Sequence, residues 1–133
     1  MKTATITQDI VLPGSPHDIF ELWMDSEKHA SFTNGEAKID RKVGGAFTTF
    51  DGWATGKTLE LFPDKKIVQL WRAEEWPEGH FSTITILLAP APTGTAVTFT
   101  QTDTPSTFAK GVTKGWQEFY WEPMSKVLAT SIK

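Results

Sequence analysis

The short spacing of turn-forming residues through the middle of the chain is the feature that most constrains its fold. Six segments there have the composition of strands, and breakers of a few residues, rich in Gly, Pro or Asp, separate them. Parallel neighbours need a crossover of a dozen or more residues, and no breaker is that long. The pattern therefore predicts antiparallel strands joined by short turns. The predicted strands are residues 37–43, 46–51, 54–62, 66–75, 81–88 and 95–101.

The N-terminal part predicts one further strand and two short helices. Residues 3–12 alternate between apolar and polar side chains, as a half-buried strand does. Ser15 followed by Pro16 is typical of a helix N-terminus, with Ser15 as the N-cap and Pro16 in the first helical position. A second short helix is expected over residues 26–32, ending at Asn34-Gly35.

The C-terminal segment, about residues 107–132, predicts a long amphipathic helix. Its apolar side chains recur at spacings of three and four residues. Trp116, Phe119 and Tyr120 are expected on one face, with Trp121 off it. Pro123 lacks a backbone N–H group and is expected to kink the helix.

This order of elements predicts an α+β fold of the helix-grip kind. A lone antiparallel sheet has one apolar face to cover, and one long amphipathic helix can cover it. We expect a curved antiparallel sheet of six to seven strands around a long C-terminal helix, with two short helices after the first strand. The 133 residues are the length of a single domain, residues 1–133. Such a grip often leaves a cavity between sheet and helix, suited to an apolar ligand.

Composition argues against several classes of function. The chain has no Cys, which removes thiolate metal sites and Cys nucleophiles, and we expect no metal, cofactor or assignable catalytic residue. The net charge of −3 argues against a nucleic-acid binder. No apolar run approaches the ~20 residues needed to span a bilayer. The N-terminus lacks the apolar core of a signal peptide, so a cytoplasmic location is expected.

The remaining polar candidates are expected at the surface. The three histidines, His17, His29 and His80, lack metal-site spacing and are expected to be exposed helix or turn residues. An acidic cluster around one turn is expected to be solvated rather than to act in acid–base chemistry. This cluster consists of Glu74, Glu75, Glu78 and His80.

The aromatic content points to the candidate site. Six Trp and nine Phe stand beside one Tyr, and so many rings must fill a core, line a cavity or form an interface. Arg72 alternates with Trp71, so the two cannot both face inward in a regular strand. The residues that we expect to line a cavity under the helix are Trp71, Ile84, Ile86, Val97, Phe99, Trp116, Phe119 and Tyr120.

Three strings of residues resemble one known family. Residues 50–57, 67–82 and 115–124 are similar, in this order, to the C-terminal domain of the activator of heat shock protein 90 ATPase homologue family. That domain is part of the START/birch-pollen-allergen-like helix-grip superfamily (SRPBCC). The resemblance extends from about Gln8 to Leu128, and Trp76-Pro77-Glu78-Gly79 is among its more specific strings. It implies the helix-grip fold and a link to the stress response.

The resemblance leaves three functions open. Stand-alone members of the superfamily bind apolar ligands, so the first is a non-enzymatic protein that binds a lipid, sterol, polyketide or aromatic metabolite. The second is an interaction module that stimulates the heat shock protein 90 ATPase, although the co-chaperone's separate N-terminal domain has no counterpart in these residues. The third is a cyclase-type enzyme using Arg72, Tyr120 or an inward acid. A cavity of several hundred cubic ångströms would favour ligand binding. A filled core with an exposed patch would favour the interaction module.

Overall fold

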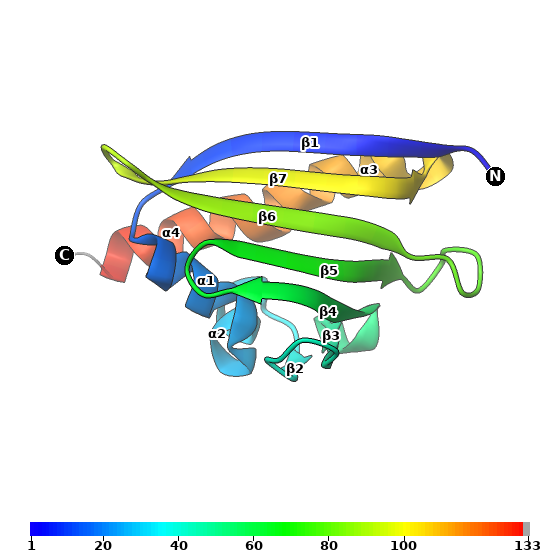
Figure 1. The fold of residues 1–133 in the computed structure, drawn as a ribbon, viewed down its shortest axis with the longest axis horizontal. Coiled ribbons are helices and arrows are strands. Elements are labelled where there is room, and N and C mark those ends of the chain that lie inside the picture. The colour runs from blue at the N-terminus through cyan, green and yellow to red at the C-terminus, as the bar shows by residue number, and fades with distance from the viewer. Residues whose placement is uncertain (132–133) are drawn as a thin grey trace.

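One curved sheet of seven strands forms the body of the protein, and the C-terminal helical segments run along one of its faces (Figure 1). The structure is a computed structural model that describes residues 1–131. Every neighbouring pair of strands is antiparallel, as predicted, in the order β1-β7-β6-β5-β4-β3-β2. The strands are β1 Thr3–Leu12, β2 Lys38–Ile39, β3 Ala46–Thr49, β4 Ala54–Phe62, β5 Lys66–Ala73, β6 Ser82–Ala91 and β7 Gly94–Pro105.

The helices also follow the predicted order. The helical elements are α1 Pro16–Met24, α2 Ser26–Thr33, the 3₁₀ turn η1 Phe50–Gly52, α3 Ser106–Trp116, the π-helical turn η2 Gln117–Trp121 and α4 Glu122–Ser131. Ser15 caps α1 as predicted: its Oγ accepts from the Asp18 N–H, and the Asp18 carboxylate accepts from the Ser15 N–H. No helix within residues 1–131 is long and apolar enough to cross a membrane.

Several strand boundaries differ from the prediction, and β7 ends at Pro105 rather than at Gln101. The strand expected over residues 37–43 is reduced to Lys38–Ile39, because the chain turns so tightly after it that a Cβ at Gly45 would collide with the Asp40 carbonyl oxygen. The strand expected to end at Leu88 continues to Ala91. Pro90 is tolerated there because β5 pairs with β6 only as far as Leu87, so no ladder bond is lost on that side.

The inner face of β6 and β7 has the predicted register. Its apolar residues are almost fully buried, and they are Ile84, Ile86, Leu88, Val97 and Phe99. The intervening Thr98 and Thr100 are only half-buried. A shift of one residue would have exchanged the two sets, so the alternation alone identified the face under the helix.

The long helix contains a π-helical turn, which overturns the expected position of Trp121. The N–H of Glu122 donates to the carbonyl oxygen of Gln117, five residues back, just before Pro123. A turn of this width brings residues five apart onto one side. Trp116 and Trp121 are therefore both buried, whereas Phe119 is 52% exposed. A strict α-helical spacing placed Trp121 off the buried face.

His29 was expected at the surface and lies in the core instead, 2% exposed. Its Nδ1 is 2.9 Å from the Trp23 carbonyl oxygen, and its Nε2 is 2.9 Å from the Tyr120 hydroxyl. A carbonyl can only accept, so Nδ1 carries the proton and the Tyr120 O–H donates to Nε2. Burial lowers the pKa of His29 to about 4, and the pair is neutral at pH 7. The eight-residue α2 is too weakly amphipathic for its sequence to show which face is buried.

The cap on α1 predicts the effect of one substitution. Ser15→Ala removes the acceptor for the Asp18 N–H and should lower the free energy of unfolding by about 1 kcal/mol. Ser15→Asp keeps a capping oxygen and serves as the control. Urea denaturation measures the difference, and an unchanged midpoint for Ser15→Ala would contradict the assignment.

The buried His29 predicts a loss of stability in mild acid. The folded state binds this proton only near pH 4, whereas the unfolded chain binds it near pH 6.5. The unfolded state therefore holds more protons between these values, and the free energy of unfolding should fall by about 3 kcal/mol as the pH drops from 6.5 to 4. His29→Gln should flatten this dependence in urea denaturation at stepped pH. His17→Gln, at an exposed position, should retain it. A His29→Gln profile parallel to the wild type would show that another group is responsible.

Candidate functional site

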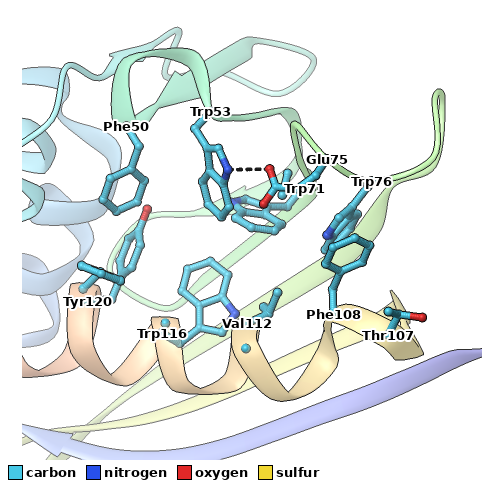
Figure 2. A pocket seen from close by; sticks show the side chains of 14 residues that line it. Phe50, Trp53, Trp71, Glu75, Trp76, Thr107, Phe108, Val112, Trp116 and Tyr120 are labelled. Atoms are coloured by element: carbon cyan, nitrogen blue, oxygen red, sulfur yellow. Dashed lines mark hydrogen bonds between the residues drawn. The ribbon is translucent and has the colours of Figure 1, made fainter.

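A cavity of about 570 Å³ lies between the sheet and the long helix (Figure 2). Eight aromatic side chains line it. From the strand side come Phe50, Trp53, Trp71 and Trp76, and from the helix side come Phe108, Trp116, Phe119 and Tyr120. Phe119 and Glu75 are exposed, so they lie where the cavity meets solvent.

The eight predicted lining residues divide into two groups. Trp71, Trp116, Phe119 and Tyr120 line the cavity. The other four, Ile84, Ile86, Val97 and Phe99, are not among the lining residues and lie in the core. Phe99 supports the wall, with its ring 4.7 Å from that of Trp116 between centroids. The alternation of β6 and β7 showed which face is inward but could not show which inward side chains the rings would cover.

Several lining residues were missed because loops and helix geometry bring them in. Phe50 and Trp53 come from the turn between β3 and β4, where Phe50 and Asp51 have positive φ angles of 52° and 58°. Glu75 and Trp76 come from the turn between β5 and β6. The Asp51-Gly52 pair signalled the first turn, but no local pattern showed that its rings fold back over the sheet.

Hydrogen bonds hold two of the Trp rings in place. The Trp116 Nε1 donates to Gln101 Oε1 at 2.7 Å, and Gln101 Nε2 donates to Ser82 Oγ at 2.9 Å. At the mouth, the Trp53 Nε1 donates to Glu75 Oε2 at 2.7 Å. The Trp76 Nε1 is buried and has no hydrogen-bond partner within the described residues. Two of the Trp rings in the wall are therefore held by hydrogen bonds.

Arg72 lies on the opposite face of β5 from Trp71, which is 3% exposed. The guanidinium donates to three carbonyl oxygens of the β5–β6 turn: to Trp76 at 2.9 Å and to Pro77 and His80 at 3.3 Å each. Arg72 does not line the cavity. It instead fixes the turn that carries Glu75 and Trp76.

The inner end of the cavity is polar but uncharged. Tyr120 contributes its ring to the wall, and its hydroxyl donates to the neutral His29. Burial raises the pKa of Tyr120, so the phenol keeps its proton. Among the described residues that line the cavity, Glu75 is thus the one side chain with a charge at pH 7.

Two glycines on the helix are among the lining residues. Gly111 and Gly115 line the cavity from within α3, where a glycine costs roughly 1 kcal/mol relative to alanine. A Cβ at Gly111 would meet no atom within 4 Å, and one at Gly115 would touch only the Phe119 ring, at 3.9 Å. No packing constraint therefore requires glycine at position 111.

The chain is similar to known proteins in both sequence and fold. The chain is 32% identical over 122 residues to the human Activator of 90 kDa heat shock protein ATPase homolog 1, covering 92% of this chain and 36% of that protein. It is 28% identical over 127 residues to an uncharacterized protein of Schizosaccharomyces pombe, covering 96% of this chain and 38% of that one. The chain thus spans little more than a third of the length of these curated relatives.

Solved structures show the same fold. An HSP90 activator from Plasmodium falciparum superposes with a TM-score of 0.82 at 23% identity, covering 97% of both chains. The Aha1 dimer of Colwellia psychrerythraea gives a TM-score of 0.77 at 20% identity, covering 92% of this chain and 96% of that one. Residues 13–129 match the family described as Activator of Hsp90 ATPase homolog 1-like protein. The family match over residues 13–129 agrees with the similarity to the human relative and with the fold. The chain therefore belongs to this family.

Proposed function

We propose that this protein binds an apolar small molecule with one polar end in the cavity between the sheet and the long helix. The observation that carries the proposal is the cavity itself, about 570 Å³ with eight aromatic side chains. Ligand sites are typically clefts of roughly 300–1,000 Å³, lined mainly by apolar groups with a few polar ones. Trp53, Trp71 and Trp116 supply flat apolar walls, and Glu75 supplies a polar group at the mouth.

Two further features support a ligand rather than a packing defect. Apolar side chains that face an open cavity forgo the stabilisation that burial would give them, so a cavity of this size costs stability. The glycine at position 111 adds to that cost within a helix, although a Cβ there would meet no atom within 4 Å. The hydrogen bond from Trp116 to Gln101 holds that ring in the wall and so opposes its movement into the space.

The second candidate function is that of an interaction module acting on heat shock protein 90. Family membership favours it, because the human relative is named an activator of that chaperone's ATPase. The chain spans only 36% of that relative, so the activity does not transfer by similarity alone. The ATPase rate of purified heat shock protein 90, measured with and without this chain, tests it. A cytoplasmic location remains a prediction from the sequence under either function.

The cyclase-type alternative has less support. Arg72 is bound to the carbonyl groups of its own turn and does not line the cavity. Tyr120 lines the cavity, but burial raises the pKa of its phenol and disfavours a phenolate base.

Filling the cavity from the helix tests ligand binding. Gly111→Leu should abolish binding, because the new side chain enters the open space that a Cβ at this position faces. It should not lower stability, since leucine is favoured over glycine in a helix by roughly 0.5–1 kcal/mol. Lys110→Leu places the same side chain on the neighbouring exposed residue, outside the cavity, and should leave binding intact.

The measurement is a chemical-shift titration with fatty acids, sterols and flavonoids, with urea denaturation of each variant. In the wild type, shifts should concentrate on Trp71, Trp116 and Tyr120. Shifts confined to the outer surface, or equal in wild type and Gly111→Leu, would contradict ligand binding in the cavity. The interaction with heat shock protein 90 would then be the better-supported function.

A further inference from the structure

We infer that the cavity selects ligands whose polar end is a positively charged nitrogen, carried on a flat apolar body, over ligands that end in a carboxylate. This inference rests on the proposed function and specifies its ligand class. Three observations carry it: the charge of the lining, the fixed position of one carboxylate, and the Trp rings around that carboxylate.

The first observation is the sign of the charge in the cavity. Glu75 is the one charged side chain among the described lining residues, and no Lys or Arg lines the cavity. Arg72 follows Trp71 on β5 but faces the other side of the sheet, where it donates to the carbonyl groups of Trp76, Pro77 and His80. A ligand carboxylate would therefore enter beside a like charge without a cation from the lining to balance it.

The second observation is that Glu75 is held in place at the mouth. Its Oε2 accepts from the Trp53 Nε1 at 2.7 Å, so the carboxylate lies against the edge of an indole ring (Figure 2). A carboxylate accepts several hydrogen bonds, and this one bond leaves capacity for a ligand N–H. Arg72 restrains the same turn from the other face of β5. An ammonium group would meet an acceptor that is already positioned.

The third observation is the arrangement of the rings beside Glu75. Trp53 stands at 72° to Trp71 with the centroids 5.8 Å apart, and Trp71 stands at 70° to Trp76 with the centroids 5.3 Å apart. Successive rings at steep angles present both faces and edges to the cavity. The face of a Trp ring attracts a cation, most strongly among the aromatic residues. The N–H edge of Trp53 is engaged with Glu75, so a cation that pairs with this carboxylate would lie close to the indole rings.

Three probes with one ring system test this inference: naphthalen-1-ylmethylammonium, naphthalen-1-ylmethanol and naphthalene-1-carboxylate. Their dissociation constants are measured by chemical-shift titration at neutral pH and low ionic strength. The wild type should bind the ammonium about tenfold more tightly than the carboxylate, the sum of a cation–π contact and a partly exposed ion pair. Added salt should reduce the ratio.

Glu75→Gln keeps an acceptor for Trp53 and removes the charge, so the ratio should fall to about threefold or less. Glu78→Gln removes an equal charge from the same turn at a residue that does not line the cavity, and should change the ratio little. A wild type that prefers the carboxylate, or a ratio that Glu75→Gln leaves unchanged, would overturn the inference.

The two proposals fail in different ways. If naphthalen-1-ylmethanol shifts the cavity rings and charge makes no difference, ligand binding stands and the charge selectivity is wrong. If none of the three probes shifts Trp71, Trp116 or Tyr120, both are wrong.

Discussion

Hydrogen bonds between strand glutamines and buried tryptophans hold the helices on the sheet, and the rest of the structure depends on them. Gln8 on β1 accepts from Trp121 at 2.8 Å, Gln69 on β5 accepts from Trp23 at 2.9 Å, and Gln101 on β7 accepts from Trp116 at 2.7 Å. A buried indole N–H without a partner costs on the order of 1–3 kcal/mol, so each pairing favours a single position of its helix. Two of these bonds hold the long helix and one holds α1.

The π-helical turn follows from the same constraint. Trp116 and Trp121 are five residues apart, and both must face the sheet to reach Gln101 and Gln8. A regular α-helix would rotate the second ring away, whereas the wider turn at Gln117–Trp121 brings it back. Pro123 follows shortly after this turn and cannot donate a backbone hydrogen bond. The regular α-helical hydrogen bonding is therefore interrupted next to a residue that already lacks one donor.

Polar contacts at both ends of the cavity hold side chains of its walls in place. At the inner end, Tyr120 donates to the buried, neutral His29. At the mouth, Trp53 donates to Glu75, whose turn is tied down by Arg72. Between them, Gly111 lines the cavity from α3 and has no side chain to occupy the space. These hydrogen bonds fix the positions of rings that line the cavity, so the contacts that hold the fold together also shape the proposed site.

The order and type of the elements, the antiparallel pairing and the inward face of β6 and β7 were determined by the sequence alone, because periodicity and short breakers are local signals. The sequence predicted only some of the residues that line the cavity. It identified Trp71, Trp116, Phe119 and Tyr120 but not Phe50, Trp53, Glu75 and Trp76. The burial of His29 and of Trp121 was also hidden. Each depends on a partner far along the chain, Tyr120 for His29 and Gln8 for Trp121. A local sequence pattern depends only on neighbouring residues and cannot indicate a partner that is distant in the sequence. Only the tertiary structure decided these pairings.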